Sequence, residues 1–569
     1  MGIKLCIPAT APRGQSAPGC ARREKPIVRG RLGQAPTPGV LDRVHDQHGG
    51  AWVRYGTPLR ALWIPVADFA RQEVFSRLAD IDPRLIEPAA QRALRTEIAH
   101  SGTYRSALIA TAPGWTAQHF VLGNAAMLAP PVSEHEATGR ETAEHEVIIT
   151  FAPHPKFTPR GSLMHWQAAL GPLVTEQPFL LFGLALAFVG PLLPFVPSDY
   201  LSPLFEFAGE PGSGKSLTGM VAMSVWAGDP NSTEAGGETW NLSPGRFDAV
   251  KLAHRHGLLL LDEANLAGTL DARRSLIQQA IFGMTSSGMR QRYGDPVSGP
   301  QSQLAVISTS NRPLRDLIEG APAEREALHQ RMITIPVAAT RAHGIFDFIP
   351  SGYESAAQAA EALRGRVDEQ WGTAGSVFVQ FVQNNIAHDE GRFRELLARG
   401  LAHHRDRLSG ETDRPRVQKC LALVAVAGLL ARRWGVLPTQ WGSPAEAVQA
   451  VARMALSGTG VPSDPRAVVH AYVERHRAAL VEVENLDRPL TKADFEAAVG
   501  FLRAGRDGTE VLIPAERFRV EFAAHAVLMR ALRAAGHAQT EPGRNSKLTI
   551  KTPRAICREG RVYCIRFSE

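Results

Sequence analysis

Cysteine is scarce in this chain of 569 residues. Its five cysteines, at positions 6, 20, 420, 557 and 564, form no C-x-x-C pair. The spacing therefore indicates neither a zinc cluster nor a disulfide framework. A reducing cytoplasm fits this cysteine usage best, so we expect a cytoplasmic protein.

Long uncharged apolar runs are also rare. The stretch QPFLLFGLALAFVGPLLPFVPS, residues 177–198, has no charge and is long enough to cross a bilayer. However, Pro191, Pro194 and Pro197 interrupt its second half, and no basic cluster flanks it. We therefore predict a buried helix that packs on a globular core, and no membrane association.

The first fifty residues lack the apolar segment of a secretory signal. They are rich in Pro, Gly and Arg without apolar periodicity, which predicts a disordered basic tail or an over-extended start of the reading frame. The whole chain is long enough for roughly three or four domains. Its formal net charge of +7 suits a polyanionic partner, although many proteins without one are as basic.

One glycine-rich stretch, GEPGSGKS at residues 209–216, follows an apolar run typical of a buried strand and precedes a helical pattern. Such a loop exposes successive backbone N–H groups to phosphates, while its lysine reaches the outer phosphates and its serine binds magnesium. A chance glycine-rich turn rarely has this spacing after a strand. We predict that the loop binds ATP and Mg²⁺ through Gly209, Gly212, Gly214, Lys215, Ser216 and Leu217.

Two carboxylates follow a second apolar run, GLLLLDEAN at residues 257–265. We expect Asp262 to bind Mg²⁺ together with Ser216, and Glu263 to orient and deprotonate the attacking water. Capping of the next helix is the alternative role for such an acidic pair. A third run, LAVISTSN, ends at Asn311, which we expect to reach the γ-phosphate or the water between the other two strands.

Two arginines further along are candidates for an arginine finger, a residue that completes the active site of a neighbouring subunit. Arg325 and Arg331 both follow Asn311, and Arg331 stands just before the strand-like MITIP. We predict that Arg331 stabilises transition-state charge across a subunit boundary, which implies a ring of identical subunits. A place on a solvated helix face is the alternative for either arginine.

With these elements the chain resembles a bacterial helicase-like family, domain of unknown function 927, which is itself similar to ring-forming P-loop helicases of phages and plasmids. The resemblance covers most of residues 60–569. Its motifs are APGW (112–115), HFVLG (119–123), GSLMHWQAALGPL (161–173), GEPGSGKS, SVWAGDP (224–230), ETWNLSP (238–244), LLLLDEAN and REGRVYCIRF. Two departures are the loop sequence GEPGSGK, where the family more often has Ser and Thr, and STSNRP, where it often has STGE.

The resemblance implies a role for the segment SSGMRQRYGDPVSG, residues 286–299. In ring helicases a hairpin at this location points into the central channel and contacts the nucleic acid backbone. Arg290 and Arg292 would bind phosphates and Tyr293 would contact a base or sugar, so we predict single-stranded DNA in a channel. A solvated surface loop is the alternative.

Helical spacing of apolar residues predicts an α-helical region after the core, and alternating helix-like and strand-like segments from about residue 490 predict a winged helix. Residues 515–569 contain eleven Lys and Arg against five Asp and Glu. This excess suggests duplex DNA contact, although a plain interaction domain can have the same outline.

We therefore predict an α/β fold with a P-loop NTPase core built on a parallel sheet. The expected parts are a tail (1–50), an N-terminal α+β domain (51–165), the ATPase core (166–345), a helical region (346–489) and a winged-helix-like domain (490–569). The predicted function is a magnesium-dependent ATPase acting on DNA, as a replicative helicase of a plasmid, prophage or other mobile element. The alternative is a P-loop ATPase that remodels protein partners or acts in a defence system.

Overall fold

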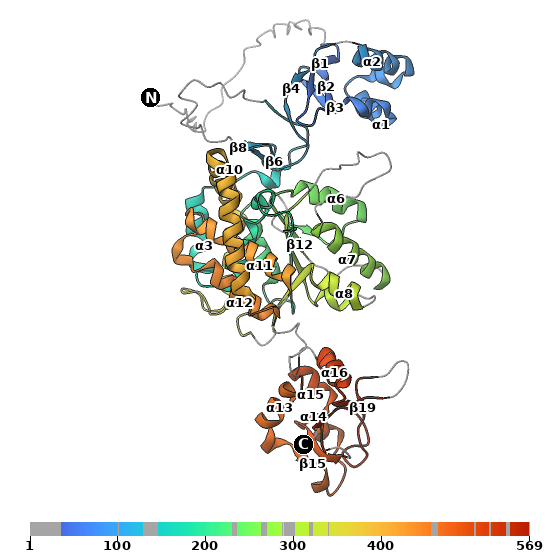
Figure 1. Ribbon diagram of the computed structural model, residues 1–569, viewed down its shortest axis with the longest axis vertical. Coiled ribbons are helices and arrows are strands. Elements are labelled where there is room, and N and C mark those ends of the chain that lie inside the picture. Colours follow the sequence, from blue (N-terminus) through green and yellow to red (C-terminus); the bar gives the residue numbers. More distant parts are fainter. Residues whose placement is uncertain are drawn as a thin grey trace, which may run out of the picture. The chain divides into compact units, whose positions relative to one another are not determined.

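The chain divides after Ala107 into two compact units, as seen in a computed structural model (Figure 1). The residues that this structure describes are 36–100, 102–128, 146–229, 236–262, 270–286, 288, 302–317, 322–338, 341–412, 414–456, 465–505, 508–522, 525–541 and 547–567.

The first unit is a four-stranded sheet with two helices on one face (Figure 1). Its elements are β1 (Gly39–His45), β2 (Ala51–Thr57), β3 (Arg60–Pro65), α1 (Gln72–Ala79), α2 (Pro88–His100) and β4 (Arg105–Ser106), and the strand order is β3-β2-β1-β4. Val53 and Tyr55 of the sheet pack with Phe75 and Leu94 of the helices.

The predicted boundary of the tail at residue 50 is wrong, because β1 begins at Gly39. This strand has mixed polarity, and its antiparallel pairing with β2 defines it more than its own sequence pattern does. Residues 1–35 lie outside the described residues.

The second unit begins with short strands that pack on its central core. They are β5 (Leu108–Ala110), β6 (Gly114–Thr116), β7 (His119–Val121), β8 (Met127–Leu128) and β9 (Val147–Ile149). Trp115 and Phe120 are buried in the same apolar cluster as Phe207 of the central sheet. The predicted N-terminal domain, residues 51–165, is therefore divided between the two units, because the APGW and HFVLG motifs bury their aromatic side chains in the core.

Five parallel strands form the central sheet, in the order β11-β12-β13-β10-β14. Their bounds are β10 (Leu204–Gly209), β11 (Glu238–Thr239), β12 (Leu258–Asp262), β13 (Ala305–Ser310) and β14 (Met332–Val337). Apart from the two-residue edge strand β11, these strands are buried along nearly their whole length, as expected for a parallel sheet that is covered on both faces. The predicted α/β class with a parallel sheet is confirmed.

Helices cover both faces of this sheet (Figure 1). On one face, alternate strand residues such as Phe205 and Leu260 pack with α4 (Pro178–Ala187) and α5 (Lys215–Met223). On the other face, residues such as Leu259 and Val306 pack with α6 (Pro244–Ala253), α7 (Leu270–Thr285) and α8 (Pro322–His329).

The uncharged stretch 177–198 is a buried part of this core. It forms α4 and the 3-10 helix η5 (Gly190–Phe195), and Phe179 to Ala187 are all buried. The predicted buried helix is confirmed. Among the described residues, no helix combines the length and apolar character needed to span a membrane.

A group of helices follows the sheet and shares its larger apolar cluster. They are α9 (Ala356–Glu369), α10 (Thr373–Leu408), α11 (Pro415–Arg433) and α12 (Pro444–Leu456). Helix α9 packs on α5, and α11 packs on α4. These helices therefore support the helix that begins at the glycine-rich loop.

The C-terminal module has its own cores around a small, mostly antiparallel sheet (Figure 1). Its elements are α13 (Pro465–Arg475), β15 (Val481–Glu482), α14 (Lys492–Ala497), β16 (Phe501–Gly505), β17 (Gly508–Pro514), α15 (Ala515–Glu521), α16 (His525–Ala534), β18 (Ala538–Gln539), β19 (Ile550–Lys551) and β20 (Arg561–Phe567). Val469 and Tyr472 of α13 lie in its core, so the module begins before the predicted boundary at 490. Its winged-helix character stays a prediction.

Candidate nucleotide-binding site

The glycine-rich loop joins the end of β10 to the start of α5, in the strand, loop and helix order that the motif requires. Gly212 and Gly214 have positive φ angles of 78° and 91°, which favour glycine. At Gly214 a Cβ atom would also lie 2.7 Å from the Ile345 side chain, and at Gly209 it would lie 2.5 Å from the Val337 carbonyl oxygen. The loop conformation therefore depends on these three glycines.

Lys215 is the first residue of α5 and is only 6% exposed. Its Nζ donates to the carbonyl oxygen of Glu210 at 2.7 Å, and it lies 3.4 Å from Ser213 Oγ. Burial lowers the pKa of Lys215, and the nearby Asp262 charge offsets part of this effect. The ammonium group is thus held inside the loop, where the motif requires a cation.

Ser216 and Asp262 come together from different elements. Ser216 Oγ donates to Asp262 Oδ1 at 2.8 Å, and Thr309 Oγ1 of β13 donates to the same carboxylate oxygen. Hydroxyl and carboxylate oxygens are suitable magnesium ligands, because Mg²⁺ binds through one or two protein carboxylates and keeps several waters. The residues therefore fit the predicted ion.

Thr309 was missed by the sequence reasoning. Its signal was the hydroxyl-rich end of the run LAVISTSN, but only the strand order places that end beside Asp262.

The loop lies where a doubly wound sheet binds ligands. Residues of α5 such as Leu217 pack on one face of the sheet, whereas Leu314 and Leu328, which follow β13, pack on the other. The connections after the neighbouring strands β10 and β13 thus leave on opposite faces, which opens a crevice at their carboxyl ends.

Asn311 lies at this crevice. Ala208 of β10 pairs with Ser310 of β13, so Gly209 and Asn311 leave the sheet side by side. Asn311 is partly buried. The structure therefore brings together the loop, Ser216, Asp262 and Asn311, whereas Glu263 lies outside the described residues.

Arg331 lies at the amino-terminal ends of the strands, opposite to the loop, because it directly precedes β14, which runs parallel to β10. The six residues of β14, at about 3.3 Å each, separate the two ends of the strand by about 20 Å. Arg331 lines a pocket of about 620 Å³ with Arg416, and its guanidinium lies 4.8 Å from the centroid of the Phe282 ring. The structure does not bring Arg331 to the loop of its own chain.

The other arginine candidate, Arg325, belongs to α8, and its side chain lies outside the described residues. Arg290, Arg292 and Tyr293 also lie outside them. Of the segment 286–299, Ser286 and Gly288 are described, and their carbonyl oxygens accept from Lys251 Nζ.

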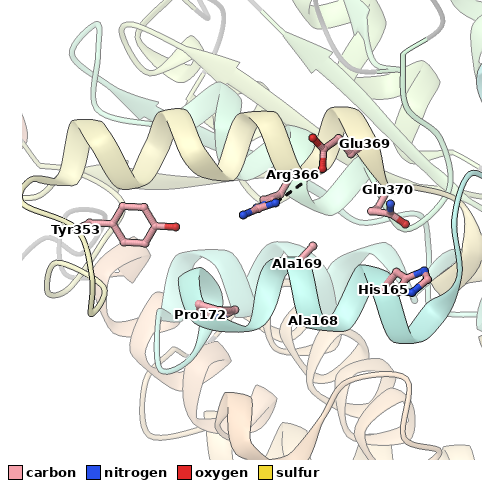
Figure 2. Close-up of a pocket in the computed structure, with 8 residues that line it drawn as sticks. All are labelled: His165, Ala168, Ala169, Pro172, Tyr353, Arg366, Glu369 and Gln370. Carbon is pink, nitrogen blue, oxygen red and sulfur yellow. Dashed lines mark ion pairs between the residues drawn. The ribbon is translucent and has the colours of Figure 1, made fainter.

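Figure 2 shows a groove of about 500 Å³ between α3 (Leu163–Val174) and α9. His165 and Tyr353 line it, and Arg366 pairs with Glu369 at 3.8 Å. The groove contains part of the GSLMHWQAALGPL motif but none of the predicted site residues.

Residues 59–282, which include the glycine-rich loop and Asp262, match the family described as "Domain of unknown function (DUF927)". The resemblance predicted from the sequence is therefore confirmed over this part of the chain. No curated protein matches the chain.

Among solved structures, the chain is similar to one described as "SCCmec type IV Cch - active helicase". The two share 15% sequence identity with a TM-score of 0.54, over 94% of this chain and 93% of that one. At this identity the likeness shows a common fold. A second structure, the NrS-1 C-terminal region, has 11% identity and a TM-score of 0.29, over 92% of this chain and 95% of that one.

Proposed function

We propose that this protein is a magnesium-dependent ATPase that acts on DNA, as a replicative helicase of a plasmid, prophage or other mobile element. The observation that carries the proposal is the hydrogen bond between Ser216 and Asp262 at the mouth of the glycine-rich loop. It unites the two magnesium ligands expected of a P-loop ATPase at the crevice of the sheet.

In the proposed mechanism the backbone N–H groups of the loop bind the phosphates, and Lys215 pairs with the outer ones. Ser216 and Asp262 hold magnesium, which supplies positive charge against the phosphates. Glu263 orients the attacking water and takes its proton, and Asn311 fixes the γ-phosphate or that water. Of these groups, Asp262 and Asn311 lie at the carboxyl ends of β12 and β13, and Lys215 and Ser216 lie where the loop meets α5.

The distance of Arg331 from its own loop supports a role in a neighbouring subunit. Because about 20 Å of strand separates the Arg331 backbone from the level of its own loop, the Arg331 side chain cannot extend to a γ-phosphate bound there. In a ring of identical subunits, however, the end of the sheet that carries Arg331 can face the loop of the next copy. We therefore assign Arg331 as an arginine finger, worth up to several orders of magnitude in turnover.

The fold supports the DNA-directed part of the proposal, since one protein of known structure with a similar fold is described as an active helicase. The proposed contacts are Arg290, Arg292 and Tyr293 with single-stranded DNA. The basic C-terminal module would contact duplex DNA.

Two substitutions test the ATPase chemistry. Lys215→Ala should abolish nucleotide binding or turnover, because it removes the charge that holds the phosphates. Glu263→Gln should bind ATP normally and hydrolyse it at least about a hundredfold more slowly, since only the general base is lost. Equilibrium binding of ATP and steady-state phosphate release measure the two effects.

Glu395→Gln is the control, because this exposed carboxylate of α10 lies outside the glycine-rich loop and has no part in the proposed chemistry. It should retain parental turnover. If Glu263→Gln hydrolyses ATP as fast as this control, the assignment of the base is wrong.

A further inference from the structure

The proposed mechanism gives no role to Glu206, a buried carboxyl group of the central sheet. Glu206 lies in β10, three residues before Gly209, between Phe205 and Phe207. Its side chain is completely buried. A buried carboxyl group costs several kcal/mol unless hydrogen bonds compensate, so an apolar side chain would have been the simpler choice for this strand.

Three donors from three segments satisfy this carboxyl group. Oε1 accepts from Ser310 Oγ at 2.6 Å and from the backbone N–H of Leu314 at 2.7 Å, and Oε2 accepts from Thr334 Oγ1 at 2.7 Å. Burial raises the pKa of Glu206 above its usual value, and these hydrogen bonds offset only part of that rise.

The two oxygens have different partners. Oε2 holds β14 through Thr334, whereas Oε1 holds the turn that leaves β13. Ser310 and Leu314 are the residues on either side of that turn, and Asn311 is its first residue. A single oxygen of the phosphate-loop strand therefore closes the turn that carries the proposed γ-phosphate sensor.

We propose that Glu206 is a positioning residue, which holds Asn311 at the γ-phosphate through its hydrogen bonds to Ser310 and Leu314. This inference rests on the proposed ATPase function and on the role of Asn311 in it. Glu206 touches neither ATP nor water. Its effect on turnover is exerted entirely through the place of the Asn311 side chain.

The test compares substitutions at the two oxygens in the full-length protein. Glu206→Leu should lower kcat by about tenfold to a hundredfold, because a misplacement of about 1 Å has this effect. The Kd for ADP, which lacks the γ-phosphate, should stay within about threefold of the parent's, since Asn311 is not needed to bind it.

Thr334→Val is the matched control. It removes a hydrogen bond from the same buried carboxyl group but leaves both bonds to Oε1, so it should lower the Tm and leave kcat within about twofold. Glu206→Gln should keep kcat near the parent's, in contrast to Glu206→Leu. Its amide oxygen accepts the bonds from Ser310 and Leu314, while the Thr334 hydroxyl rotates to accept from the amide nitrogen.

A double-mutant cycle with Asn311→Ala separates positioning from plain destabilisation. If Glu206 acts through Asn311, the double variant should turn over ATP no more slowly than Asn311→Ala alone. If the losses of kcat in the two single variants instead multiply in the double variant, the inference is wrong. If Glu206→Leu does not fold, Ser310→Ala takes its place in the cycle, with a smaller loss of kcat expected.

Parental kcat in Asn311→Ala would remove the sensor from the proposed function, and the inference with it. A slow Asn311→Ala beside a folded Glu206→Leu of parental kcat would overturn the inference alone.

Discussion

At the scale of the residue, Lys251 is a buried cation that caps the end of α7. Its Nζ donates to the carbonyl oxygens of Gly283 at 2.8 Å, Ser286 at 2.7 Å and Gly288 at 3.2 Å. Burial lowers the pKa of Lys251 to about 8, so the group is still charged at neutral pH. A cation at a helix C-terminus is favourable, and here it also fixes the start of the segment that precedes Arg290.

Lys251→Met should weaken the end of α7 by about 2–3 kcal/mol, because it removes hydrogen bonds from a charged donor and leaves buried carbonyl groups unpaired. Amide hydrogen exchange at residues 279–286 should therefore accelerate. The control is Lys419→Met, which removes an ion pair with Asp199 and a contact with the Tyr200 ring, both away from α7. Equal exchange at the end of α7 in both variants would contradict this account.

Single residues also mark where prediction from the sequence stopped. The loop, Asp262 and Asn311 could be predicted because each follows an apolar run and is chemically distinctive. Thr309 and Glu206 could not, since their partners depend on which strands are neighbours. A lone Glu within a buried strand has no local pattern that reveals its three donors.

At the scale of the element, the core strands were predictable because parallel strands covered on both faces give continuous apolar runs. Weaker elements were not. Helix α10 spans Thr373–Leu408 but breaks at Asp389, whose carboxylate accepts from the backbone N–H of Arg392 and so caps a second helical segment. The sequence pattern of this region predicted an α-helical region without the bounds of its helices.

Helix α13 illustrates the same limit at a module boundary. Its sequence pattern is helical like that of its predecessors, so the boundary was placed at residue 490. The structure assigns α13 to the C-terminal module because Val469 and Tyr472 pack with Ile513 and Phe518. Such a boundary depends on packing partners, which amphipathic spacing does not identify.

At the scale of the whole molecule, the proposal that Arg331 acts in a neighbouring subunit predicts complementation. A Lys215→Ala chain and an Arg331→Ala chain should each be inactive, whereas mixed rings should regain part of the activity. Some interfaces of such rings join an intact Lys215 to an intact Arg331. ATP turnover of the mixture, after subunit exchange is shown, measures this recovery.

The control mixture combines Lys215→Ala with Glu263→Gln. Both residues belong to the same site of one chain, so mixing should restore nothing. Absence of recovery in the first mixture, in rings that exchange subunits, would contradict the assignment of Arg331.

The central claim is that ATP hydrolysis by this protein serves DNA, and one measurement tests it most directly. ATP turnover of the parent should rise when single-stranded DNA is added. Arg290→Ala with Arg292→Ala should keep basal turnover and lose this rise, and the log-log salt slope of DNA binding should flatten by about one to two units. Arg392→Ala with Arg399→Ala, at exposed positions of α10, should change neither. Turnover that single-stranded DNA leaves unchanged, in a folded protein that hydrolyses ATP, would contradict the account and favour an ATPase that remodels protein partners.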